Sequence, residues 1–275
     1  MLHFDLVQSI SLAGSASVGN DDRAGATAQR AWMIDGATDL GPPGLLGAQG
    51  GAAWIASTAD RAFAAAGPGP LQEVVAAVFA GLDDAYHRAR VREPLGRWEL
   101  PSAAFLCAAL EDERLRIAWL ADCACLHLRG EAVLRLGPQT NAFETQEAEA
   151  IRAAGLALEP ARSAPTLERL RHTRARAERR VLGVEPGHAA AVHYDAISVA
   201  PGDELVLMTD GLAALIDDYG VSLREFALRL RGEGLHGLAT RLRAIEAEDP
   251  DCRRFARFKS SDDATGLWLR IAGAP

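Results

Sequence analysis

"RAWMIDGATDLG", residues 30–41, places an Asp-Gly pair directly after a short apolar run. The apolar residues 31–34 predict a buried strand, and Asp35 would then lie where that strand ends. Asp-Gly is also a common turn signal, because both residues suit tight turns. The stretch therefore allows two interpretations of Asp35, as a turn residue or as a carboxylate directed at a ligand.

Five more aspartates lie at the ends of predicted strands: Asp21 and Asp22 in "GNDDR", Asp210 in "LVLMTDG", and Asp262 and Asp263 in "SSDDATGLW". Strand ends that are distant in sequence can meet at one edge of a sheet, where several carboxylates repel one another unless a cation neutralises them. Carboxylate oxygens favour magnesium, manganese or calcium over zinc. Two such ions can activate a water molecule and hold a phosphoryl group, so the pattern indicates metal-dependent phosphate chemistry.

Composition limits the kinds of partner. The 275 residues carry a formal net charge of −8. No general nucleic-acid binding is expected, because neutralising phosphates requires a basic surface. A signal peptide begins with a positively charged region, but the N-terminal stretch has no basic residue before Arg23. No apolar run reaches the ~18 residues of a membrane span. We expect a soluble, cytoplasmic protein that does not enter a membrane.

Two scarce residue types add little to the functional prediction. The four cysteines are Cys107, Cys123, Cys125 and Cys252. Their spacing gives no dense disulfide framework, and a lone C-x-C is a weak zinc signal, so we expect reduced thiols in the core. Lys259 is the only lysine, against 28 arginines, which is typical of a GC-rich bacterial genome.

Hydrophobic periodicity predicts strands in consecutive blocks, separated by pairs of helices. Strands are expected over 3–13, over 31–34, as a meander over 102–136, as a pair broken by Pro201-Gly202, and over 264–271. Helices are expected over about 48–66 and 70–88, from Asn141, over 166–182, from a Ser222–Glu225 cap to about Arg231, and over 236–246. This order suits a layered α+β domain and not a regular βαβ fold.

Five segments, taken in order, resemble the motifs of the metal-dependent (PPM, or type 2C) Ser/Thr protein phosphatases in their short bacterial form. "GNDDR" is similar to the family's Asn-Glu-Asp segment, and "AWMIDGATDLG" to its apolar-Asp-Gly-x-Gly-Gly segment. "IAWLADCACLHLRGE" is similar to the strand-turn-strand that usually reads Gly-Asp-Ser-Arg. "DELVLMTDGL" resembles the Ser-Asp-Gly strand and "DDATGLWL" the final Asp-Asn-x-Thr strand. The resemblance covers nearly the whole chain.

The resemblance implies a fold, an activity and partners. The fold would be a four-layer α-β-β-α sandwich with two central antiparallel sheets, formed by residues 1–275 as a single domain. The activity would be hydrolysis of phosphomonoesters on Ser/Thr phosphoproteins by a metal-bound water, without a phosphoenzyme. Two Mn²⁺ or Mg²⁺ ions would be bound, with a third, weaker ion as in bacterial members. The partners would be a phosphorylated protein and a cognate Ser/Thr kinase.

The resemblance also assigns the central metal ligands by position. Asp35 would bridge the two ions, and the Gly36 carbonyl would ligate one of them. Asp210 and Asp262 would be direct ligands. Asp35, Asp210 and Asp262 would thus be the catalytic residues, acting through the metal-bound water.

Three further aspartates have implied roles around these ligands. Asp21 stands where the family has a glutamate near the second ion, and it is one methylene shorter. Asp22 would hold metal-bound water. Asp122, in "ADC", matches the aspartate linked to the third ion.

The chain departs from the family pattern around the substrate phosphate. The arginine that usually binds this phosphate is replaced by Ser17. Ala37 stands where many eukaryotic members have histidine, and Ala121 and Ala124 replace the glycine and arginine of Gly-Asp-Ser-Arg. The metal-binding set is therefore intact, whereas the residue that binds the substrate phosphate is unknown.

An arginine-rich segment offers a replacement. Residues 162–180 contain Arg162, Arg169, Arg171, Arg174, Arg176, Arg179 and Arg180, and they lie where family members carry a flap beside the active site. Arginine suits phosphate because its fork of N–H groups matches the oxygens, so Arg174 and Arg176 are candidates. The alternative is a solvated helix face paired with Glu168 and Glu178.

Two other functions stay open from the sequence. A catalytically weak or inactive domain of the same fold could act as a regulatory or binding module, and Ser17 and the altered turn at Asp122 favour it. A phosphatase for small phosphorylated molecules is the other alternative, because fold alone does not fix function.

Overall fold

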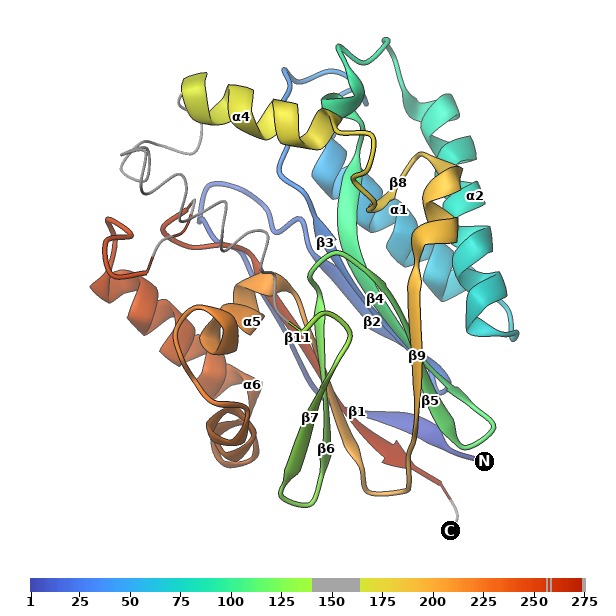
Figure 1. Ribbon diagram of the computed structural model, residues 1–275, viewed down its shortest axis with the longest axis vertical. Coiled ribbons are helices and arrows are strands. Elements are labelled where there is room, and N and C mark those ends of the chain that lie inside the picture. Colours follow the sequence, from blue (N-terminus) through green and yellow to red (C-terminus); the bar gives the residue numbers. More distant parts are fainter. Residues whose placement is uncertain (140–163, 256, 258, 274–275) are drawn as a thin grey trace.

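Two antiparallel β-sheets stack face to face, and helices cover both outer faces, so the layers follow the order α-β-β-α (Figure 1). The structure, a computed structural model, describes residues 1–139, 164–255, 257 and 259–273. The layering confirms the predicted fold class.

Each sheet combines strands from distant parts of the chain. The first sheet has the order β1 (His3–Leu12), β11 (Ala264–Ala272), β10 (Glu204–Met208), β6 (Ala124–Arg129) and β7 (Ala132–Leu136). The second has the order β2 (Arg23–Ala26), β3 (Arg30–Gly36), β4 (Ser102–Glu111), β5 (Arg114–Leu120) and β9 (His193–Ser198), and β8 (Leu182–Gly183) pairs with β4. The first and last strands of the chain, β1 and β11, are neighbours.

The predicted meander over 102–136 exists as four strands, but it does not form one sheet. The hairpin β4–β5 belongs to the second sheet, and the hairpin β6–β7 belongs to the first. The chain crosses between the sheets at residues 121–123, where Ala121 has a positive φ of 65°. This crossing carries Asp122. Local alternation predicts each strand but not the sheet that it joins, which is why this part of the prediction was wrong.

Three hydrophobic layers hold the sandwich together. Phe63 of α1 (Gly51–Ala65) and Phe79 of α2 (Leu71–Ala89) pack on Phe105 of the second sheet. Leu106 and Leu207 belong to the core between the two sheets. The helices α5 (Asp210–Asp217) and α6 (Leu223–Glu248) cover the other face of the first sheet. Burial of each apolar side chain contributes about 1.5–3 kcal/mol, so the layers themselves keep the strand ends in place.

The remaining helical predictions have mixed outcomes. Ser222 Oγ accepts a hydrogen bond from the Glu225 N–H, which confirms the predicted cap. The two helices predicted after it are both present within α6, which is interrupted between them at Gly234, where φ is 71°. The helix predicted over 166–182 is α4 (Ala164–Ala175), and it ends earlier than expected. The helix predicted from Asn141 lies outside the described residues, and α5 was not predicted.

Short elements and cysteines complete the description. The described residues include two 3₁₀ turns, η1 (Arg97–Glu99) and η3 (Pro186–Ala191). Cys107, Cys123 and Cys125 are free and buried, and Cys252 is free and partly exposed, which agrees with the expected reduced thiols. Within the described residues, every helix is too short or too polar to cross a membrane.

Candidate metal centre

Acidic side chains from five segments gather at one end of the sandwich. We call six of them the acidic cluster: Asp21 and Asp22 before β2, Asp35 in β3, Asp122 between β5 and β6, Asp210 at the start of α5, and Asp262 before β11. Their mutual influence shows how close they are. After burial, the charges of Asp210, Asp22 and Asp122 raise the pKa of Asp35. The structure therefore brings together the site residues predicted from sequence.

The Asp35-Gly36 pair stays within a strand. Asp35 pairs with Ala104 and Gly36 with Ala103 in the β3–β4 ladder, so the turn interpretation of this pair is wrong. A Cβ atom on Gly36 would lie 2.8 Å from the carbonyl oxygen of Ala52 and 2.9 Å from that of Asp21. Glycine is needed here because the start of α1 and the 20–22 segment pass so close to the strand.

The second Asp-Gly pair also serves close packing. Asp210 is the first residue of α5, directly after β10. A Cβ atom on Gly211 would lie only 1.9 Å from the carbonyl oxygen of Asp263. Glycine at this position thus lets the segment before β11 lie against α5, which places Asp262 near Asp210.

The two central carboxyl groups lie against each other. Asp35 and Asp210 are hydrogen-bonded to each other, and burial first, then neighbouring carboxylates, raises the pKa of each well above its ordinary value. Two ionised carboxylates in contact repel each other strongly, so one of the pair is expected to hold a proton unless a cation lies nearby. The centre of the cluster is therefore short of positive charge.

Asp22 lies deeper, with 3% of its surface exposed. Burial raises its pKa to about 7, although hydrogen bonds from Thr265 and Thr209 act in the opposite direction. The Thr209 hydroxyl donates to Asp22 Oδ2 at 2.9 Å and accepts the Thr265 N–H at 3.0 Å. The two buried threonines thereby fix the orientation of the Asp22 carboxyl group.

Asp262 and Asp263 have different contacts although they are adjacent. Asp262 Oδ1 accepts a hydrogen bond from Lys259 Nζ at 2.7 Å. The Asp263 carboxylate accepts the N–H groups of Gly14 and Asp21, each at 2.8 Å. Asp263 therefore positions the segment that carries Asp21, whereas Asp262 pairs with Lys259.

The donor set fits a hard divalent cation. All its side-chain donors are carboxylate oxygens, which magnesium and manganese prefer, and the raised pKa of both Asp35 and Asp210 reflects a deficit of positive charge. Among the residues that the structure describes, no three histidine, cysteine or acidic side chains form a ready-made set around one ion position. The fit therefore rests on the chemistry and the charge of the cluster.

The arginine-rich segment contacts the loop that follows Gly36. Arg174 Nη1 donates to the Thr38 carbonyl at 2.5 Å, and Arg171 Nη2 donates to the Leu40 carbonyl at 2.6 Å. Burial, followed by the charge of Arg179, lowers the pKa of Arg174 to about 10. Arg171 and Arg174 thus face the protein and not solvent, which disfavours the solvated-face alternative for them.

The other residues named for phosphate binding contribute less. Arg176 is exposed. Ser17 is exposed too and hydrogen-bonds to Ser15. Its side chain is uncharged and cannot replace the charge of the usual arginine. Arg162 lies outside the described residues. Arg174 is thus the better placed of the two sequence candidates.

Sequence reasoning missed three residues of the site. Lys259 had been noted only as a compositional feature, although it stands three residues before Asp262. Thr209 and Thr265 carry no chemical signal of their own, because a buried threonine is common in strands. Their places directly before Asp210 and two residues after Asp263 were the available hint.

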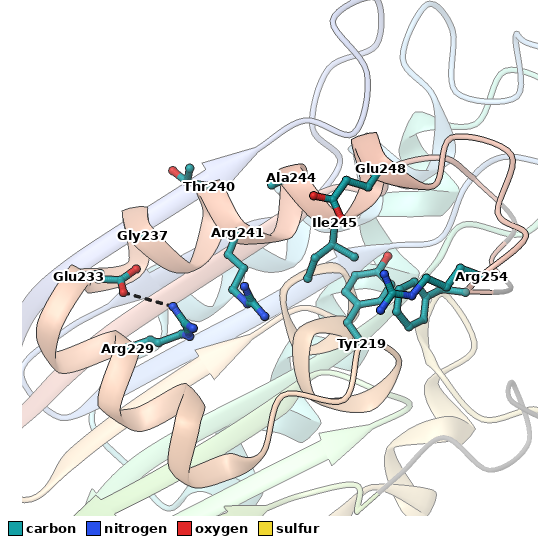
Figure 2. Close-up of a pocket in the computed structure, with 11 residues that line it drawn as sticks. Tyr219, Arg229, Glu233, Gly237, Thr240, Arg241, Ala244, Ile245, Glu248 and Arg254 are labelled. Carbon is teal, nitrogen blue, oxygen red and sulfur yellow. Dashed lines mark hydrogen bonds and ion pairs between the residues drawn. The ribbon is translucent and has the colours of Figure 1, made fainter.

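A cavity of about 670 Å³ lies apart from the acidic cluster, along α6 (Figure 2). Arg241 and Ile245 of α6 face Tyr219 across it. The Phe255 ring packs against Tyr219 with the centroids 4.9 Å apart, and the Arg254 guanidinium lies over Phe255. Arg229 donates to Glu233 on its wall at 3.3 Å. None of the residues that line it belongs to the acidic cluster, so we do not assign the phosphate chemistry to it.

Comparison with known proteins identifies the family and the fold. The family model described as protein phosphatase 2C matches residues 16–245. The chain matches no curated protein in sequence. Among solved structures, the serine/threonine phosphatase PstP/Ppp of Mycobacterium tuberculosis is 18% identical, with 99% of each chain covered and a TM-score of 0.59.

Two further structures have the same fold. The catalytic domain of PstP in complex with two manganese ions is 18% identical, covering 99% of this chain and 100% of that one, with a TM-score of 0.59. PppA, a regulatory component of the type VI secretion system (T6SS) in Pseudomonas aeruginosa, is 17% identical, with 98% of each chain covered and a TM-score of 0.57. At these identities the structures show a shared fold.

Proposed function

This chain belongs to the protein phosphatase 2C family, and we propose that it hydrolyses phosphoserine and phosphothreonine in proteins with the help of Mn²⁺ or Mg²⁺. The observation that carries the proposal is the acidic cluster, in which partly buried carboxyl groups from five segments meet with too little positive charge. Such a site is costly to fold unless it binds cations, so its retention at one end of the sandwich supports a functional role.

The proposed ligand set follows the resemblance. Asp35 would bridge two ions, the Gly36 carbonyl and Asp210 would contact them, and Asp262 would complete the set, with Asp122 near a third ion. Such ions, when bound, activate a water molecule as the nucleophile and neutralise charge on the phosphoryl group. The manganese complex of the structurally similar PstP catalytic domain supports this choice of ion.

The chain's own residues would orient the reactants. Asp22, held by Thr209, would accept a hydrogen bond from water in the site and so orient it. Arg174 would hold a substrate oxygen, because its guanidinium lies beside the loop that follows Gly36. Asp21 would act from the rim through water, since it is shorter than the usual glutamate.

The setting of the activity is part of the same proposal. Residues 1–275 would act as one domain, which the pairing of β1 with β11 supports because it joins the two ends of the chain. The protein would work in the cytoplasm on a phosphoprotein, opposed by a Ser/Thr kinase.

The first test is hydrolysis of p-nitrophenyl phosphate and of phosphoserine peptides with Mn²⁺, Mg²⁺ or EDTA. The wild type should turn over both substrates with Mn²⁺ and neither with EDTA. Asp35→Asn should lose about a hundredfold or more in kcat, as expected when electrostatic stabilisation of the transition state is lost. Asp84→Asn, an exposed change on α2, is the matched control and should retain full activity.

Other results would point elsewhere. Turnover of phosphorylated metabolites without turnover of phosphopeptides would contradict the protein substrate. Mn²⁺ binding without any turnover would favour the regulatory alternative. Equal rates for the wild type and Asp35→Asn would contradict the site.

A further inference from the structure

The only lysine of the chain lies in the acidic cluster. Lys259 Nζ is 2.7 Å from Asp262 Oδ1, and the two side chains are 39% and 42% exposed. The same carboxylate oxygen also accepts the Asp263 N–H at 2.9 Å. The oxygen of Asp262 that faces Lys259 is therefore already occupied by two donors.

The influence of the ammonium group reaches beyond this contact. Burial lowers the pKa of Lys259, whereas the nearby Asp262, Asp210 and Asp35 raise it, with a net rise. The charge of Lys259 also opposes the burial-driven rise in the pKa of Asp21. Lys259 thus lies within electrostatic range of four members of the cluster.

The segment around Lys259 is anchored on both sides. On the α6 side, the buried Asp249 carboxylate accepts the backbone N–H groups of Arg253, Arg254 and Phe255 and the Arg257 guanidinium, at 2.8 to 3.0 Å. Arg257 Nε also donates to the Ser260 carbonyl at 3.1 Å. On the β11 side, Arg243 Nη2 donates to the Asp262 carbonyl at 2.8 Å. The backbone therefore holds Lys259 within reach of Asp262.

We propose that Lys259 is an internal counter-cation that competes with a divalent ion for Asp262. The inference rests on the proposed function, because it takes Asp262 as a metal ligand. Without an ion, the ammonium group neutralises part of the charge of the cluster. An ion that binds Asp262 must displace the ammonium group, and the displaced charge stays on the same anchored segment and repels the ion.

The consequence is a weakened ion position. The ion that Asp262 helps to hold would bind less tightly than it would without the ammonium group beside that carboxylate. Lys259 thereby sets the divalent-ion concentration at which the Asp262 position fills, and removing its charge should lower that concentration.

The test is calorimetric titration with Mn²⁺ alone, which needs no turnover. Lys259→Met keeps most of the side-chain length and removes the charge, and Lys259→Gln provides a second, polar variant. Arg253→Met is the matched control, because Arg253 is an exposed cation of the same segment that pairs with Asp251 at 3.6 Å. We expect about a tenfold tighter Kd for the ion at Asp262 in both lysine variants and less than about a twofold change in Arg253→Met.

Asp262→Asn separates this inference from the proposed function. Weaker Mn²⁺ binding in Asp262→Asn, together with tighter binding in the Lys259 variants, supports the competition. An unchanged or weaker Kd in the Lys259 variants overturns it while leaving the metal site intact. Unchanged Mn²⁺ binding in Asp262→Asn overturns both the competition and the ligand role of Asp262.

Discussion

The buried carboxyl group of Asp22 should make the metal-free protein less stable as the pH rises, and Asp22→Asn should remove this effect. Asp22 is 3% exposed, and its pKa is raised to about 7 from an ordinary value of 3.8. The folded protein therefore keeps the proton over a pH range in which the unfolded chain has lost it. Asparagine has a similar shape, and its side-chain oxygen can still accept the Thr209 hydroxyl.

The magnitude follows from proton linkage. Below pH 3.8 both states are protonated, and above pH 7 both are ionised, so the free energy of unfolding falls only between these values. Each unit of pKa shift corresponds to about 1.4 kcal/mol, which gives a total of about 4 kcal/mol across the window. Between pH 5 and pH 7, Asp22→Asn should therefore gain about 3 kcal/mol relative to the wild type.

The assay is urea denaturation in EDTA at several pH values from 5 to 8, with both proteins in the same buffers. The difference in free energy of unfolding between variant and wild type isolates Asp22 from the other titrating groups. Asp84→Asn, which removes an exposed aspartate, should show a constant difference from the wild type. If Asp22→Asn also shows a constant difference, the carboxyl group is ionised in the folded protein at every pH tested, and the reasoning is refuted.

Three further changes test the packing and the arginine assignment. Gly211→Ala should destabilise the protein by about 2–4 kcal/mol in thermal unfolding, because a backbone oxygen lies 1.9 Å from the new Cβ. The control, Gly81→Ala, lies in open space on α2 and should stabilise the protein by about 0.5–1 kcal/mol. Similar free energies of unfolding for the two variants would contradict the close approach at Gly211. Arg174→Ala should raise the KM for a phosphopeptide about tenfold and leave the Mn²⁺ affinity unchanged. Arg176→Ala, at an exposed position, should change neither quantity. An equal KM in the wild type and both variants would exclude Arg174 from substrate binding. Ser222→Ala should cost about 1 kcal/mol through the lost cap, with the rate of hydrolysis unchanged.

The positions at which strands end could be predicted from the sequence, whereas the contacts that require particular residues there could not. The apolar run before Asp35 placed the aspartate correctly, because a buried strand leaves a clear pattern. The need for Gly36 could not be predicted in the same way, since it depends on the carbonyl groups of Ala52 and Asp21 that pack against it. The turn interpretation of this pair was wrong because Asp35 and Gly36 both belong to β3.

Elements whose identity depends on distant contacts were harder to predict. The strands β5 and β6 have similar local patterns but belong to different sheets. The helix α5 has eight residues and begins at an Asp-Gly pair, so it is too short to show a helical period. The arginine-rich segment was correctly expected to be helical, but its composition could not show that Arg171 and Arg174 face the loop after Gly36.

Single residues without periodicity were the hardest to interpret. Lys259 stands three residues before Asp262, yet in a sequence this lysine is indistinguishable from a solvated surface residue. Only the fold, which turns the segment before β11 back over the acidic cluster, brings its ammonium group to the Asp262 carboxylate.

The number of Mn²⁺ ions bound per chain tests the central claim most directly. Calorimetric titration of the wild type should give two ions, and Asp35→Asn should bind one ion at most, because Asp35 is proposed to contact both. Equal stoichiometry in the two proteins, or no Mn²⁺ binding by the wild type, would contradict a metal centre at the acidic cluster.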